Sequence, residues 1–131
     1  MDSASTYDVV IVGAGPAGGY VAKTLAEQQV SVALVEQHQT IGYPLHCAGL
    51  VSPRIFEMFG IPKEKIVQNS IKKANIHSPT GHILSIGSEK IQAYRIDRAA
   101  FDTYLVNEAK KRCGGSYCRK STFHSKKFTE H

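Results

Sequence analysis

Three glycines in the segment GAGPAG constrain this chain more than any other feature: Gly13, Gly15 and Gly18. They follow a short apolar run, residues 7–12, and precede a helical pattern. Glycine permits a tight turn at the first position, removes a side chain at the second, and lets helix and strand pack closely at the third. A second apolar run, residues 31–36, completes a strand–helix–strand unit. The pattern predicts a parallel pair of strands, the first of them buried on both faces.

The same segment indicates a dinucleotide site. Pro16 and Ala17 open the helix, whose N-terminal N–H groups and dipole favour a pyrophosphate. Glu36 ends the second apolar run, at the distance where a carboxylate accepts hydrogen bonds from a ribose diol and repels a 2′-phosphate. The alternative is that the glycines only form a turn and Glu36 is a solvated strand end. Gly19 is an additional helical glycine, which costs about 1 kcal/mol relative to alanine.

Composition excludes a wholly disordered chain, a collagen-like repeat and a membrane protein with several spans. With 131 residues, 42% of them hydrophobic and 21% charged, the chain is typical of one compact globular domain. The net charge of +5 is uneven: residues 1–62 hold two basic and five acidic groups, whereas residues 63–131 hold fourteen and six. Because the basic residues lie mostly at helix ends with little aromatic interleaving, we expect no nucleic-acid partner.

Cysteine usage and the N-terminus predict a cytoplasmic protein. Three cysteines are an odd number in a chain of this size, which argues against a disulfide framework. Cys113 and Cys118 lack the further ligands that a zinc site needs, so no metal site is expected. The first apolar run has no basic leader and is interrupted by glycines, unlike a signal peptide or a membrane span.

The middle of the chain changes its pattern. Residues 37–52 form a loop, and a short helix is expected from Pro53, capped by Ser52, to Gly60. Alternating residues over 71–96 predict short antiparallel strands.

A second helix then begins at Asp97, the expected N-cap, and continues to about residue 113. Arg98 falls in its first turn, where a cation opposes the helix dipole. The arginine is either solvated or placed there for a bound diphosphate.

Three segments together resemble a known family: YDVVIVGAGPAGG…LVEQ, IGYPLHCAGLVSPRIFEMFGI and YRIDRAAFDTYLVNEAKKRCG. They are similar to the N-terminal third of geranylgeranyl reductases, FAD-dependent oxidoreductases of the p-hydroxybenzoate hydroxylase superfamily. That family includes archaeal digeranylgeranylglycerophospholipid reductase-like enzymes, which saturate the isoprenoid chains of membrane lipids. The resemblance covers residues 7 to about 115, and the HCAGLVSPR and IDRAAFD segments carry most of its specificity.

The resemblance implies FAD as the cofactor. It places the glycines at the FAD pyrophosphate, Glu36 at the adenosine ribose and Arg98 along the extended cofactor. Cys47, Ala48 and Gly49 would lie beside the isoalloxazine ring, with Ala48 in place of the family's commoner glycine. Taken alone, Cys47 is expected to be a small buried thiol; in the family's setting it is a candidate for lining the flavin or substrate pocket. The implied cofactor-binding residues are Gly13, Gly15, Pro16, Ala17, Gly18, Glu36, Cys47, Ala48, Gly49 and Arg98.

The fold expected from the resemblance is α/β but incomplete. It is a Rossmann-like FAD-binding βαβ unit with the first antiparallel strands of a substrate domain. The expected parts are the FAD-binding unit and flavin loop over residues 1–70, partial substrate-domain strands over 71–96, a return helix over 97–115, and a partial strand with a divergent basic tail over 116–131.

The function implied by the resemblance is reduction of C=C bonds in the geranylgeranyl groups of isoprenoid lipid precursors. An isoprenoid or lipid substrate and an external electron donor, NAD(P)H or ferredoxin-like, would be the partners. Contact with a membrane surface is compatible with a lipid substrate, so the expected location is cytoplasmic or membrane-peripheral. We expect this chain alone to be inactive. The alternative is a truncated, non-catalytic nucleotide-binding fragment, or a subunit completed by another chain.

Overall fold

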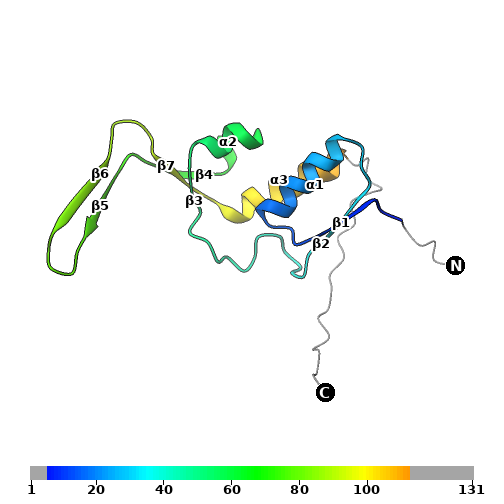
Figure 1. The fold of residues 1–131 in the computed structure, drawn as a ribbon, viewed down its shortest axis with the longest axis horizontal. Coiled ribbons are helices and arrows are strands. Elements are labelled where there is room, and N and C mark those ends of the chain that lie inside the picture. The colour runs from blue at the N-terminus through cyan, green and yellow to red at the C-terminus, as the bar shows by residue number, and fades with distance from the viewer. Residues whose placement is uncertain (1–5, 113–131) are drawn as a thin grey trace, which may run out of the picture. The chain divides into compact units, whose positions relative to one another are not determined.

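The structure is a computed structural model that describes residues 6–112. The described chain divides into two compact units, residues 6–44 with 101–112, and residues 45–100. Eleven elements follow one another along the described chain (Figure 1): β1 (Val9–Val12), α1 (Pro16–Glu27), β2 (Val32–Val35), β3 (Leu50–Val51), α2 (Arg54–Phe59), the 3-10 helix η1 (Lys63–Lys65), β4 (Val67–Ile71), β5 (Lys73–His77), β6 (Ile83–Gly87), β7 (Ala93–Ile96) and α3 (Arg98–Arg112).

The first unit contains the predicted strand–helix–strand arrangement. Strand β1 pairs in parallel with β2, with Val9 opposite Val32 and Val12 opposite Val35. Helix α1 connects the two strands, as a parallel crossover requires. The α/β class and the βαβ opening are therefore confirmed.

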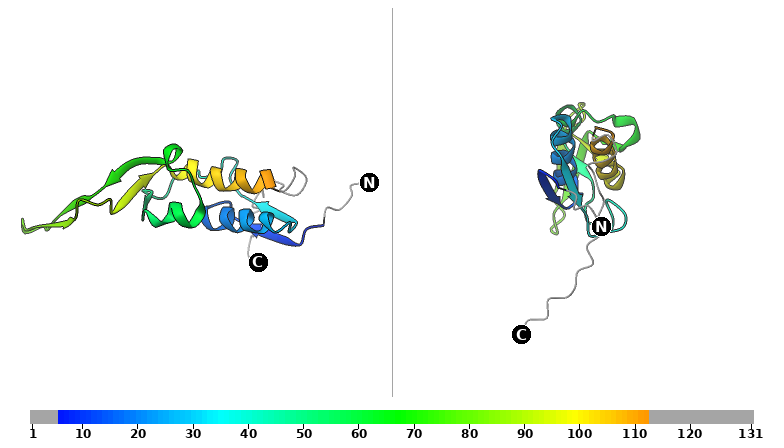
Figure 2. Two further views of the ribbon diagram at one scale, coloured as in Figure 1. Left: turned by 90° about the horizontal axis from the view of Figure 1, so that it is seen from above. Right: turned by 90° about the vertical axis from the view of Figure 1, so that its right-hand side faces the viewer.

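Helices α1 and α3 pack together against this strand pair. Gly19 of α1 is buried, and a Cβ atom added there would lie 3.0 Å from the Cβ atom of Leu105. At the far ends of the same helices, Arg112 Nε lies 3.3 Å from Glu27 Oε1. The two helices run side by side (Figure 2). Their contact closes a core made of Ala14, Ala22, Val32, Leu34, Val106 and Ala109.

The expectation that the first strand is buried on both faces is wrong for β1. Its side chains alternate between partly buried and exposed, and Val10 and Val12 are 60% and 83% exposed. Ile11, on the opposite face, packs against the core. Helices supply the cover for one face only, and within residues 6–44 and 101–112 no element covers the other.

The second unit is built from antiparallel strands, as the alternation predicts. Strand β7 lies between β3 and β4 in one sheet, and β5 pairs with β6 in a separate hairpin. Phe56 and Tyr94 meet edge to face at 5.4 Å between ring centroids. Ile61, Ile66 and Ile96 are also buried in this unit.

Two strands of this unit differ from the sequence expectation. Strand β3 lies inside the segment expected to be a loop, residues 37–52, and β4 begins at Val67, before the alternation becomes regular. Both are strands because they pair with β7, which is distant from them in the sequence. A two-residue strand carries no periodic signal of its own.

Two of the three predicted capping residues lie at helix ends as expected. Asp97 Oδ1 accepts the N–H of Ala100 at 2.9 Å, so it caps α3 as expected. Helix α2 begins at Arg54, one residue later than predicted, so its N-cap is Pro53 and the expectation that Ser52 caps it is wrong. It ends at Phe59, and its C-cap Gly60 has a left-handed φ of 61°. The expected end of the return helix, the strand and tail over 116–131, and Cys113 and Cys118 lie outside the described residues.

None of the helices described between residues 6 and 112 combines the length and the apolar character needed to cross a membrane.

Candidate dinucleotide site

The glycine segment forms a tight connection between β1 and α1. Gly13 adopts a φ of +98°, which side chains disfavour, and its N–H donates to the Val35 carbonyl at 2.7 Å. A Cβ atom added to Gly18 would lie 1.9 Å from the Gly13 carbonyl oxygen and 3.3 Å from Ile11 Cγ2. The absence of a side chain at Gly18 therefore lets α1 approach the end of β1.

The N-terminus of α1 is open. Gly15 is its N-cap residue, Pro16 follows at the first helical position, and no side chain caps the helix. A Cβ atom added to Gly15 would meet nothing within 4 Å, and the first turn holds no acidic residue. Because the first N–H groups of a helix lack partners within the helix, this end offers donors and a positive dipole to an anion. An FAD pyrophosphate fits this chemistry.

Glu36 follows β2 and is held beside the glycine segment. Its Oε2 atom accepts the N–H of Ala14 at 2.7 Å, and its Oε1 atom accepts the N–H of His38 at 2.9 Å. The His38 ring atom Nδ1 also lies 2.8 Å from Oε1. Burial alone would raise the pKa of Glu36, but these hydrogen bonds and the nearby imidazole together hold the pKa below its ordinary value. Glu36 is therefore an anion at neutral pH.

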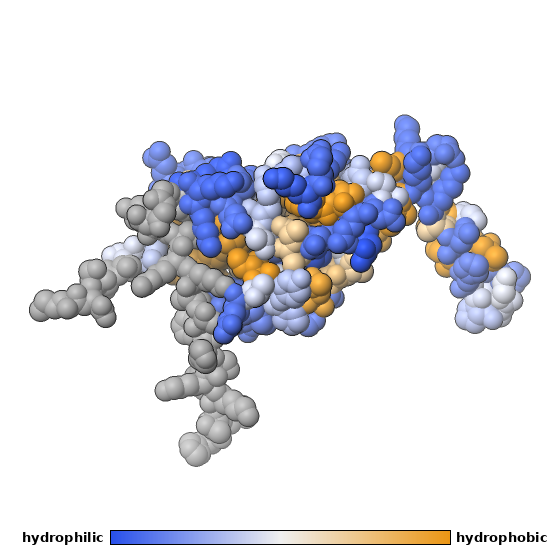
Figure 3. All heavy atoms as spheres, turned by 180° about the vertical axis from the view of Figure 1, so that it is seen from behind, coloured by the Kyte–Doolittle hydropathy of each residue, from blue (hydrophilic) through white to orange (hydrophobic). Residues whose placement is uncertain are grey.

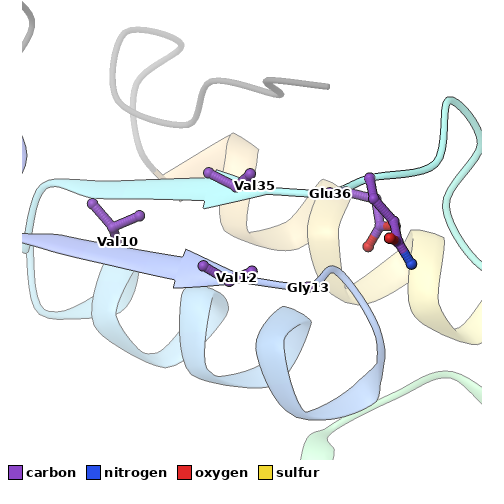
Figure 4. A pocket seen from close by; sticks show the side chains of 6 residues that line it. Val10, Val12, Gly13, Val35 and Glu36 are labelled. Carbon is purple, nitrogen blue, oxygen red and sulfur yellow. The ribbon is translucent and has the colours of Figure 1, made fainter. Parts of the chain in front are cut away.

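A hollow of about 610 Å³ lies beside the carboxyl ends of the two parallel strands (Figure 4). Its lining combines the exposed valines of β1 and a partly buried valine of β2 with the start of the glycine segment and the residues after β2: Val10, Val12, Gly13, Val35, Glu36 and Gln37. Ligands of open parallel sheets bind outside the carboxyl ends of the strands, so this hollow lies at the expected end of the sheet.

The remaining predicted residues lie in the second unit. Gly49 is buried with a φ of +74°, and a Cβ atom added there would lie 2.4 Å from the Ile96 carbonyl oxygen and 3.4 Å from Arg98 Cγ. The structure thus brings Gly49 and Arg98 together. Ala48 is exposed. Cys47 is exposed too, so the expectation of a buried thiol is wrong. This residue lies in a loop, and no helix or strand holds it in a core.

The sequence reasoning missed two residues. His38 contacts the Glu36 carboxylate, and its only sequence signal is its position two residues after Glu36. Gly19 packs against α3. Helix propensity alone predicts only that a glycine at this position destabilises α1. Within residues 6–112, no group of three or more His, Cys, Asp or Glu side chains could hold a metal ion.

Comparison with curated proteins confirms the resemblance to geranylgeranyl reductases. The chain is 40% identical over 106 residues to a digeranylgeranylglycerophospholipid reductase of Methanocaldococcus jannaschii, covering 80% of this chain and 27% of the relative. It is 41% identical over 103 residues to the enzyme of that name from Methanospirillum hungatei, covering 76% and 26%. The chain thus spans about a quarter of the length of these curated relatives.

Solved structures agree with this result. A geranylgeranyl bacteriochlorophyll reductase-like protein of Thermoplasma acidophilum superposes with a TM-score of 0.77 at 29% identity, over 88% of this chain and 30% of that one. A flavin-dependent brominase shares the fold, with a TM-score of 0.64 at 21% identity over 88% and 29%. The FAD binding domain family matches residues 6–122, nearly the whole chain. The open helix end, the glycine segment and the carboxylate after β2 therefore belong to an FAD-binding chain, a member of the FAD binding domain family.

Proposed function

We propose that this chain is the FAD-binding part of an oxidoreductase that reduces C=C bonds of geranylgeranyl groups in isoprenoid lipid precursors. The observation that supports the proposal best is the open N-terminus of α1 at Gly15, where an added Cβ would meet nothing and no side chain caps the helix. The similarity to relatives named as geranylgeranyl reductases supports the substrate class.

In this proposal the first unit binds the adenosine diphosphate half of FAD. Gly13 and Gly18 shape the connection, and Gly15, Pro16 and Ala17 present the helix N-terminus to the pyrophosphate. Glu36, held as an anion beside Ala14, accepts hydrogen bonds from the hydroxyl groups of the adenosine ribose. The low pKa of this carboxylate keeps it ready to accept hydrogen bonds throughout the physiological pH range.

Four residues of the second unit complete the proposed set. Arg98, packed against Gly49, is proposed to lie along the cofactor. Cys47, Ala48 and Gly49 are proposed to lie beside the flavin ring, where the exposed Cys47 would face the flavin or substrate. No residue of this chain is assigned as a proton donor.

The reaction needs two electrons and two hydrogens for each double bond. One carbon of the C=C bond gains a hydride, the other gains a proton, and an external donor such as NAD(P)H or a ferredoxin-like protein restores the electrons. When bound, FAD supplies the hydride chemistry. The residues described here bind and orient the cofactor.

The short length of this chain relative to the curated proteins favours a second candidate function. Because the chain covers about a quarter of their length, it is also compatible with a non-catalytic FAD-binding fragment or a subunit completed by another chain. Mass spectrometry of a geranylgeranyl lipid after incubation with this chain, FAD and dithionite distinguishes the two. Saturation of double bonds by this chain alone would exclude the non-catalytic candidate.

The FAD proposal is tested by titrating the chain with FAD and following flavin fluorescence. Gly15→Ala places a methyl group in the open space before α1, and we expect it to weaken FAD binding at least tenfold. Gln28→Ala, at the other end of α1, is the matched control and should bind like the parent chain. No FAD binding by the parent chain, or equal affinity in all three proteins, would contradict the proposed site.

A further inference from the structure

The His38 ring forms a hydrogen bond with one oxygen of the Glu36 carboxylate. Nδ1 lies 2.8 Å from Oε1, and the side chains of His38 and Glu36 are 42% and 12% exposed. An ionised carboxylate only accepts hydrogen bonds. Nδ1 must therefore carry a hydrogen, either in the imidazolium or in the Nδ1–H tautomer of the neutral ring.

The carboxylate has little accepting capacity left. A carboxylate offers about four lone-pair positions. Ala14 N–H takes one on Oε2, and the backbone N–H and ring of His38 take two on Oε1. A ribose diol brings two hydroxyl donors, so one of the three existing donors has to leave when both hydroxyls bind.

The ring is the donor that can leave at the lowest cost. The Ala14 N–H belongs to the glycine segment and the His38 N–H to the chain leaving β2, so both are fixed by the backbone. The imidazole is a partly exposed side chain that reaches water by rotating about its own bonds.

We propose that the His38 ring is a displaceable occupant of the ribose subsite, and that it competes with the adenosine diol for Oε1 of Glu36. His38 thereby sets the affinity of this chain for nucleotides with an intact diol. The inference rests on the proposed function, since it takes Glu36 as the ribose-binding carboxylate. His38→Ala keeps the backbone N–H on Oε1, so the carboxylate remains oriented by two backbone donors.

The test is calorimetric titration of the 131-residue chain with ADP and with 2′,3′-dideoxy-ADP. His38→Ala should bind ADP about threefold to tenfold more tightly than the parent, the equivalent of one partly exposed hydrogen bond of ordinary net strength that no longer has to be displaced. Its affinity for the dideoxy nucleotide should be unchanged. His82→Ala, an exposed histidine of the second unit, is the matched control and should leave both affinities unchanged.

Ring nitrogen signals of His38 in long-range ¹H–¹⁵N spectra give a second readout. We expect ADP to change these signals and the dideoxy nucleotide to leave them unchanged. Unchanged or weaker ADP binding by His38→Ala, or an equal gain for both nucleotides, overturns the competition while leaving the FAD site intact. If the parent chain binds neither ADP nor FAD, the proposed function fails and the competition fails with it.

Discussion

The glycines around the α1 N-terminus differ in what they permit. Gly15 has an ordinary φ of −74° and open space where a Cβ would be, so an added methyl group would meet no other part of the fold. Gly18 has the Gly13 carbonyl oxygen 1.9 Å from the position of a Cβ, so its lack of a side chain matters to the fold. One motif therefore contains a glycine with open space beside it and a glycine that lets the helix pack.

This difference predicts unequal effects on stability. Gly18→Ala should lower the free energy of unfolding by about 2–3 kcal/mol, because the backbone of the turn must move to admit the methyl group. Gly15→Ala should change it by less than about 1 kcal/mol, because the lower entropy of the unfolded chain and the poorer N-cap preference of alanine act in opposite directions. Urea denaturation of both variants measures the two values, and equal losses would contradict the assignment.

Glu36 predicts an acid-sensitive contribution to stability. Its folded-state pKa is lowered, so its stabilising effect is present above the unfolded value of about 4.3 and is lost as pH falls through the folded value. Glu36→Gln should cost about 1–2 kcal/mol at pH 7, because the amide replaces a charged acceptor of hydrogen bonds.

The difference between parent and Glu36→Gln should shrink as the pH falls below about 4. Denaturation at pH 7, 5 and 3 measures it. A difference that stays constant over this range would show that the carboxylate charge does not stabilise the fold.

At the scale of elements, the contact between α1 and α3 depends on a small residue. Gly19 allows the two helices to approach until its missing Cβ would lie 3.0 Å from Leu105 Cβ, and Leu105 is fully buried. In an isolated helix, Gly19→Ala would add about 1 kcal/mol of stability. In this fold, the added methyl group instead meets a helix that is already packed.

We therefore expect Gly19→Ala to destabilise the chain by about 1–2 kcal/mol. Val21→Ala is the matched control on the exposed side of the same helix and should change stability by less than about 0.5 kcal/mol. Thermal unfolding followed by circular dichroism measures both variants. A Gly19→Ala variant that is more stable than the parent would show that the helix pair tolerates the methyl group.

At the scale of the whole molecule, apolar residues remain on the surface. In the β5–β6 hairpin, Ala74 lies opposite Ile86 and Ile76 opposite Leu84, which gives the hairpin one apolar face. Ile76 and Leu84 are 52% and 60% exposed, and Figure 3 shows apolar atoms at the surface of this region. Exposed apolar strands favour association between chains.

The double variant Ile76→Thr with Leu84→Thr should therefore remain monomeric to higher concentration than the parent, because threonine keeps a good strand propensity while adding a hydroxyl group. Light scattering against concentration measures the effect, and the free energy of unfolding should change by less than about 1 kcal/mol. Ile96→Thr, at a buried position, serves as the contrast and should destabilise the second unit. Unchanged association in the double variant would contradict a role for the hairpin face.

The sequence alone determined the βαβ unit, the glycine turn, the Asp97 cap and the carboxylate after β2, because each depends on residues that are close in sequence or on a regular period. The tertiary structure decided the rest. It placed Gly19 against Leu105, gave Glu36 its partners Ala14 and His38, exposed one face of β1 and divided the antiparallel strands between two sheets. These features depend on contacts between segments far apart in the chain, and no local propensity or spacing encodes which side chains such contacts bring together.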